Sequence, residues 1–223
     1  HGGNGYTSPD VLAAGARWTA PDPADSLAGM TPAFANFVAP ARARPQLWRL
    51  LLGSLLALAV YFGWIILLTR GLRLLAGVEG ERLVWQMASG STPAGMLLLL
   101  LSFVGMTLGT LVAARLLHRR GLRSLTGRPA KVLRDFVTAV AVVAVIYGLG
   151  ALLWSQRFDA LPNLPPGLWF GLLPLALAGV AVQTLSEELA FRGYLMQQLA
   201  VRFRSPLIWM GLPTLTFALL HYD

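Results

Sequence analysis

The chain has 223 residues, is 56% hydrophobic and carries a formal net charge of +8. Only 13% of its residues are charged, against about 25% in a soluble domain, and long windows hold no charge at all, which excludes an ordinary soluble globular protein. Cysteine is absent, which excludes a disulfide framework and a cysteine metal site. We therefore expect an integral membrane protein.

The first 46 residues differ from the rest in composition. They contain six prolines among Gly, Ala and Asp, and no apolar periodicity extends beyond a few positions. A segment of this kind cannot bury a core. We predict a disordered Pro/Ala/Gly-rich N-terminal tail over 1–46, followed by a transmembrane helical domain over 47–223.

Five long apolar runs follow the tail. A helix needs roughly 20 residues to cross about 30 Å of hydrocarbon, and the first four runs are close to that length. The predicted spans are Leu50–Thr69, Ala94–Ala114, Phe136–Trp154, Trp169–Leu185 and Pro206–His221. Because the fifth run ends with the chain, we expect a C-terminally incomplete domain with more helices downstream. The predicted fold class is all-α, a polytopic transmembrane helix bundle with about five spans present.

The second run contains two glycines at small-xxx-small spacing, Gly105 and Gly109. This spacing lets the backbones of two membrane helices approach closely. We interpret it as a packing contact between helices.

The basic residues are unevenly distributed between the two sides of the predicted bundle. Thirteen Lys and Arg lie over 42–49 directly before the first span or in the second-to-third and fourth-to-fifth connections, and only four lie in the other connections. The positive-inside rule then predicts a multi-pass protein of the cell (inner) membrane with its N-terminus in the cytoplasm. The rule also explains the basic cluster over 115–134 without nucleic acid, for which no reading motif is present. Membrane lipids with anionic headgroups are the expected partners of this cluster.

Ionisable residues within the spans and their ends are almost confined to Glu187, Glu188, Arg192 and His221. Inserting each of these charged residues into a membrane costs roughly 2.5–3.5 kcal/mol. A group of them therefore indicates a polar site. Glu188 and Arg192 are four residues apart, share a helix face and are predicted to pair. Glu187 lies about 100° away around the helix and is left as a free carboxylate. His221, four residues after Phe217, is predicted to be its partner as a hydrogen-bond donor or as a fellow metal ligand.

Three structural interpretations remain open beside this functional one. The sequence Thr184-Leu-Ser-Glu187 fits a capping box that would begin a new helix. Glu188 and Arg192 would suit an ion pair that holds the bundle end together, and His221 would suit a buried histidine on a packing face.

At these residues the chain resembles a known family. Glu187-Glu188-x-x-x-Arg192 followed by Phe217-x-x-x-His221 is similar to the first two signature motifs of the CPBP family (CAAX protease and bacteriocin-processing, or Abi) of intramembrane proteases. The similarity covers roughly 184–221 and includes Phe191-Arg192-Gly193.

The resemblance implies a helical membrane core of about eight helices and a hydrolase. It implies that Glu187 activates water, that Glu188 and Arg192 shape the site, and that His221 positions the water or stabilises the oxyanion. The family has been described both as metalloproteases and as metal-free glutamate proteases. The residues do not choose between these, so no cofactor is assigned, and Glu187 and His221 are the candidate ligands of a divalent metal such as zinc.

The family's further histidine, usually followed by Asn or Asp, has no counterpart in this chain. We therefore expect the 1–223 chain alone to be inactive and the full-length protein to be an intramembrane endopeptidase acting near the cytoplasmic face. Its partner would be a peptide or protein substrate, either lipidated or membrane-bound. The alternatives are a catalytically inactive membrane scaffold or immunity protein, and a proton-coupled transporter-like bundle.

Overall fold

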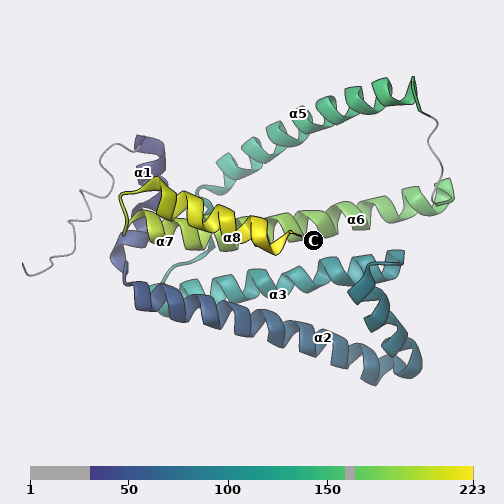
Figure 1. The fold of residues 1–223 in the computed structure, drawn as a ribbon, viewed down its shortest axis with the longest axis horizontal. Helices are drawn as coiled ribbons and strands as arrows, with labels where there is room; N and C mark the ends of the chain where they lie inside the picture. The colour runs from purple at the N-terminus through teal and green to yellow at the C-terminus, as the bar shows by residue number, and fades with distance from the viewer. Residues whose placement is uncertain (1–30, 159–163, 223) are drawn as a thin grey trace, which may run out of the picture.

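The computed structural model describes residues 31–158 and 164–222, and every regular element in these ranges is helical. Four helices are long and apolar enough to cross a membrane, which confirms the predicted all-α transmembrane class: Leu47–Ser89, Pro93–His118, Pro129–Ser155 and Pro166–Ala200. Figure 1 shows α2, α3 and α6 running alongside one another, with α5 diverging from α6. Leu207–Leu220 is a shorter apolar helix.

The fifth predicted span therefore differs from the other four. It forms the π-helical turn η5 (Leu207–Gly211) and α8 (Leu212–Leu220), 5 and 9 residues long. At about 1.5 Å per residue they reach about 21 Å, which is short of the roughly 30 Å hydrocarbon layer. Within the described residues, α8 packs against the π-helix η4 (Glu188–Met196).

Part of the predicted tail is ordered. Residues 1–30 lie outside the described residues, but α1 (Pro32–Val38) and the 3-10 helix η3 (Ala39–Ala43) follow them. Thr31 begins α1, since its hydroxyl accepts the Phe34 N–H at 3.4 Å. Val38 and Ala41 are fully buried in a cluster with Ala200 and Val201. The end of the predicted tail thus differs from the expectation, because these few apolar side chains pack on the C-terminal helices.

The helix α2 (Leu47–Ser89) is twice as long as the predicted span and contains a break at Gly77. Gly77 has φ 56° and ψ −125°, a conformation that glycine adopts without a steric penalty. The chain after the break folds back, since a Cβ on Gly80 would lie 2.0 Å from the Leu72 carbonyl oxygen. Helical periodicity continues on both sides of Gly77, so the sequence pattern did not reveal the break.

The helix α3 (Pro93–His118) packs closely along α2. A Cβ on Gly105 would lie 2.6 Å from the Trp64 Cβ, and a Cβ on Gly109 would lie 2.3 Å from the Ala57 carbonyl oxygen. These distances are far below van der Waals contact, so both positions require glycine. The predicted role of the small-xxx-small pattern in helix packing is confirmed.

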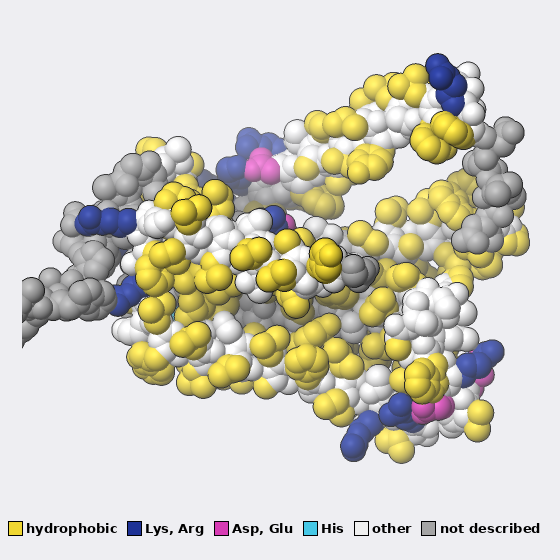
Figure 2. Space-filling model, in the orientation of Figure 1, with side chains coloured by type: hydrophobic (Ala, Val, Ile, Leu, Met, Phe, Trp, Pro, Cys, Tyr) yellow, Lys and Arg dark blue, Asp and Glu magenta, His cyan; other side chains and the backbone are white. Residues whose placement is uncertain are grey.

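After the short α4 (Leu122–Thr126), α5 (Pro129–Ser155) has no buried residue. The helix α6 (Pro166–Glu187) continues without interruption into the π-helix η4 (Glu188–Met196) and then α7 (Gln197–Ala200). Figure 2 shows hydrophobic side chains over most of the visible surface, with most of the Lys and Arg near the ends of the helices. A soluble protein rarely exposes so much contiguous apolar surface, whereas a membrane protein must.

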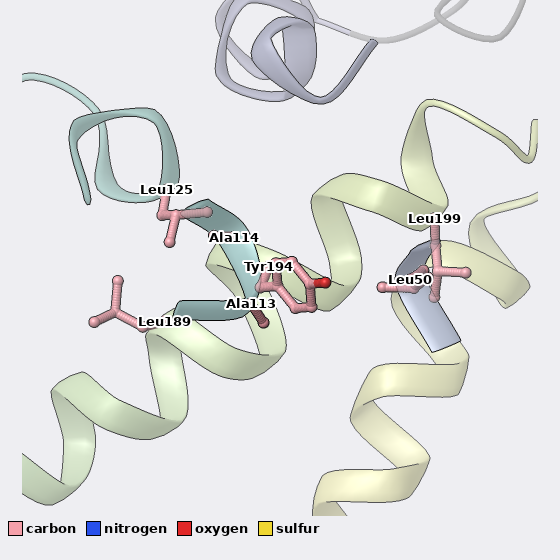
Figure 3. Close-up of a cluster of buried hydrophobic side chains, with 7 residues drawn as sticks. All are labelled: Leu50, Ala113, Ala114, Leu125, Leu189, Tyr194 and Leu199. Atoms are coloured by element: carbon pink, nitrogen blue, oxygen red, sulfur yellow. The ribbon is translucent and has the colours of Figure 1, made fainter. Parts of the chain in front are cut away.

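The main hydrophobic core lies at one end of the bundle, where α2 and α5 begin and α3 and α7 end; we call this the basic end. Figure 3 shows Tyr194 at the centre of this core, between residues of α2, α3, α4 and α7. Gly53 leaves room for it, because a Cβ there would lie 1.9 Å from the Tyr194 hydroxyl. The core therefore fixes the helix η4 against the first two spans.

Candidate active site

Glu187 lies at the junction of α6 and η4, and its side chain is only 15% exposed. The Gln183 amide, one turn earlier, donates to Glu187 Oε1 at 3.1 Å. The helix runs continuously through residues 184–187, so the capping-box interpretation of Glu187 is wrong. Among the described residues, Glu187 forms no ion pair with Lys or Arg, and its polar neighbours are this neutral amide and the imidazole of His221.

His221 faces this carboxylate from the end of α8. Its Nε2 lies 3.7 Å from Glu187 Oε1, and its Nδ1 lies 2.8 Å from the Phe217 carbonyl oxygen. Since a carbonyl oxygen only accepts, Nδ1–H donates to it, and Nε2 of the neutral ring is then an unprotonated acceptor. The side chain of His221 is 49% exposed, so the interpretation as a buried packing histidine is wrong.

Two acceptors that face each other at this distance suit a small donor between them. The 3.7 Å separation exceeds a direct hydrogen bond, and a water molecule can donate one hydrogen to the carboxylate and one to the imidazole. The pair therefore forms a place where a water would be held with its oxygen lone pairs free.

Aromatic packing brings the two residues together. The rings of Phe191 on η4 and Phe217 on α8 meet edge to face with centroids 5.3 Å apart, and the Phe217 and His221 rings lie 4.2 Å apart. Edge-to-face and offset contacts of this kind are favourable beyond the area they bury. Phe191 and Phe217 therefore dock α8 onto η4 and hold His221 beside Glu187.

Glu188 and Arg192 form the pair expected from their spacing, through Glu188 Oε1 and Arg192 Nη1. Both side chains are about half exposed, at 48% and 55%. The two adjacent carboxylates therefore have different surroundings, one paired with a guanidinium and the other facing an imidazole. An interpretation of this pair as a structural ion pair remains open.

These residues begin a π-helical segment, Glu188–Met196. The π-helix is rare and is often found at functional sites, because its wider turn reorients the side chains that follow. Gly193 lies within it, and a Cβ there would be 3.1 Å from the Leu125 carbonyl oxygen. Glycine at this position allows α4 to pack against the helix that carries the motif.

Sequence reasoning missed the polar contacts that support this helix. The Tyr194 hydroxyl and His118 Nε2 lie 3.0 Å apart, and His118 Nδ1 lies 3.1 Å from the Arg44 carbonyl oxygen. The buried Arg120 donates to Gln197, and burial lowers the pKa of Arg120 to about 10. These partners are more than 70 residues apart, so no local spacing indicates them. Gln183 does carry a local signal, four residues before Glu187.

The metal hypothesis can be compared with the donors present. No group of three or more His, Cys, Asp or Glu comes together in the described part of the chain. Glu187 and His221 supply two donors, whereas a catalytic zinc usually has three protein ligands. Glu187 and His221 alone do not complete such a zinc site, so the proposed hydrolysis is derived from these two side chains.

A separate apolar cavity lies between α3 and α6 and includes Leu97, Leu100, Trp169 and Leu172 in its lining. None of the four motif residues borders it. The candidate site is therefore the polar pair at the α6–η4 junction and not this cavity.

Comparison with known proteins adds one match. Residues 169–223, a quarter of the chain, match the family model described as type II CAAX prenyl endopeptidase Rce1-like. No curated protein and no solved structure matches the chain. The matched segment contains all four candidate residues, and the match confirms the resemblance stated from the motifs.

Proposed function

We propose, from the similarity of residues 169–223 to the type II CAAX prenyl endopeptidases, that the full-length protein is a membrane endopeptidase. It hydrolyses a peptide bond near the cytoplasmic membrane face, using a water molecule activated by Glu187. The observation that carries the proposal is the position of His221 Nε2, 3.7 Å from Glu187 Oε1 within the matched segment.

The chemistry follows from the two acceptors. Glu187 removes a proton from the water held between it and His221, and the water oxygen bonds to the scissile carbonyl carbon. The proton on Glu187 then passes to the amide nitrogen as the C–N bond breaks, which restores the carboxylate. His221 keeps the water oriented toward the carbonyl throughout.

The surrounding residues support this role. Arg192 pairs with Glu188, so Glu187 is the carboxylate of the two without a guanidinium partner among the described residues. Gln183 and the Phe191–Phe217 contact position Glu187 and His221 respectively. Substrates of this site would be peptides whose scissile bond is brought to the membrane by a lipid group or by a membrane segment.

The proposal is tested with Glu187→Gln in the full-length protein in native membranes, with a farnesylated peptide ending in a CAAX sequence as probe. The change keeps size and polarity but removes the base, and general-base catalysis contributes about 10²–10⁴-fold. We expect a loss of cleavage in that range at unchanged abundance, with new C-termini read by mass spectrometry.

Glu79→Gln is the matched control, because Glu79 pairs with Arg82 on the exposed segment after the Gly77 break. It should cleave like the wild type. Wild-type activity that survives Glu187→Gln would refute the proposal. A wild type that cleaves nothing while its cellular phenotype survives the substitution would favour the scaffold, and loss of proton-coupled uptake would favour the carrier.

A further inference from the structure

Three guanidinium groups gather where α2 begins and α3 ends, those of Arg44, Arg49 and Arg119. Nη1 of Arg44 and Nη1 of Arg49 both donate to the Leu117 carbonyl oxygen, at 3.3 and 3.1 Å. Two guanidinium groups that share one acceptor must lie close together. Arg119 follows at the left-handed end of α3 with φ 53°, and its positive charge acts on Arg44. We call these three residues the arginine cluster.

The arginine cluster has no acidic partner within the described residues. The carboxylates of the described ranges are engaged elsewhere, with Arg73, Arg82, Arg192, His221 and the Lys131/Arg134 pair. The Arg49 Nε is buried and has no hydrogen-bond partner in this part of the chain. The pKa of Arg44 lies below its ordinary value because of desolvation and then because of the charges of Arg119 and Arg49. The cluster therefore concentrates positive charge that no carboxylate of the described residues neutralises.

The neighbouring side chains place the cluster at the edge of the apolar surface. Trp48 is 57% exposed and carries the Arg49 guanidinium 4.5 Å above its ring. Leu51, one turn along α2, is 67% exposed. Exposed Trp next to exposed Leu at the start of a membrane span is typical of the headgroup level of a bilayer. An anion bound from this side would therefore lie at the headgroup level.

We infer that the arginine cluster is a binding site for the phosphodiester of an anionic lipid headgroup. Arginine suits this ligand because its planar donors match phosphate oxygens in pairs. The lipid chains would lie along the exposed apolar face of α2, and the phosphate would supply a negative charge that the described residues do not place here. The site is independent of the proposed proteolysis.

The test uses the full-length protein in detergent, titrated with phosphatidylglycerol, phosphatidylcholine or inorganic phosphate, with bound lipid counted by native mass spectrometry. Each Arg near an anionic surface contributes about fivefold in affinity. We expect Arg44→Gln/Arg49→Gln to weaken phosphatidylglycerol binding by about 10- to 30-fold, and Arg44→Lys/Arg49→Lys to retain part of it.

The matched control is Arg123→Gln/Arg128→Gln, which removes the same charge at two exposed positions of the 115–134 cluster and should weaken phosphatidylglycerol binding much less, by the loss of diffuse attraction alone. Equal losses in both double variants would overturn the site in favour of diffuse attraction. Inorganic phosphate that displaces phosphatidylglycerol at equal concentration would overturn the lipid assignment. An unchanged melting temperature without lipid shows that the Gln variant is folded. If the Gln variant does not fold, the Arg44→Lys/Arg49→Lys variant is used instead. Tighter binding of phosphatidylglycerol than of phosphatidylcholine by that variant would support the site, and equal binding of the two lipids would overturn it.

Discussion

Glu187 and Glu188 are neighbours in the chain, yet their surroundings differ because a helix turns successive side chains by about 100°. Arg192 reaches only Glu188, and His221 reaches only Glu187. Two carboxylates with different partners can take different roles in one reaction. If one water is held by Glu187 and His221 together, the two residues should act as a unit.

A double-mutant cycle tests this unit. We expect His221→Ala to lower kcat of the full-length protein by about 10²-fold or more, since the water loses one of its two acceptors. Adding Glu187→Gln should cost much less than the product of the single losses, because residues that act together are strongly non-additive. Steady-state cleavage of the farnesylated probe by the three variants measures this, and multiplicative losses would show that the residues act on different steps.

At the scale of elements, glycine decides how closely the first two long helices approach. Gly105 and Gly109 of α3 face Trp64 and Ala57 of α2 with no room for a side chain. Membrane helices gain little from hydrophobic exclusion between them, so this close van der Waals contact carries much of the α2–α3 association. The candidate site depends on it indirectly, because η4 and α6 pack on α3.

Gly109→Leu should therefore destabilise the bundle by several kcal/mol or prevent its folding, since overpacking against backbone atoms costs about 1–3 kcal/mol even where side chains can adjust. Gly63→Leu in α2 is the control, because no heavy atom lies within 4 Å of a Cβ at that position. Thermal unfolding in detergent, followed by tryptophan fluorescence, compares the two. Equal melting temperatures would mean that α2 and α3 are not held together at Gly109.

At the scale of the whole molecule, the orientation of the chain in the membrane is predicted from the distribution of its basic residues. The segment around Ser91 connects α2 to α3 at the end opposite to α4 (Figure 1), and the basic residues gather near α4. The positive-inside rule predicts that the basic end lies in the cytoplasm. The candidate site lies deeper, at the level of the middle of α3, since the Ser186 hydroxyl beside Glu187 contacts Thr107 and the Phe103 carbonyl oxygen, and a substrate would reach it from this end.

The absence of cysteine from the chain allows a direct test of this orientation. Ser91→Cys and Arg123→Cys place a single thiol at exposed positions of the two ends. In intact cells a membrane-impermeant maleimide should label Ser91→Cys, and Arg123→Cys should react only after permeabilisation. The reverse pattern would contradict a cytoplasmic N-terminus.

Features that depend on local sequence patterns were predictable from the sequence. Apolar run lengths indicated the four long spans, the small-xxx-small spacing indicated a close helix contact at Gly105 and Gly109, and the i, i+4 spacing indicated the Glu188–Arg192 pair. These features depend only on helix geometry and the hydrophobic effect. Catalytic roles for Glu187, Glu188, Arg192 and His221 remain predictions that cleavage assays must test.

Only the tertiary structure decided the remainder. The break at Gly77, the packing of α1 on the C-terminal helices and the Tyr194–His118 contact join segments that no local pattern relates. The position of His221 beside Glu187 depends on Phe217 meeting Phe191 after the chain has reversed between α7 and η5. The geometry within a helix repeats from residue to residue and can be predicted from local spacing. Which two helices pack together depends on side chains distant in sequence, so the tertiary structure was needed to identify these contacts.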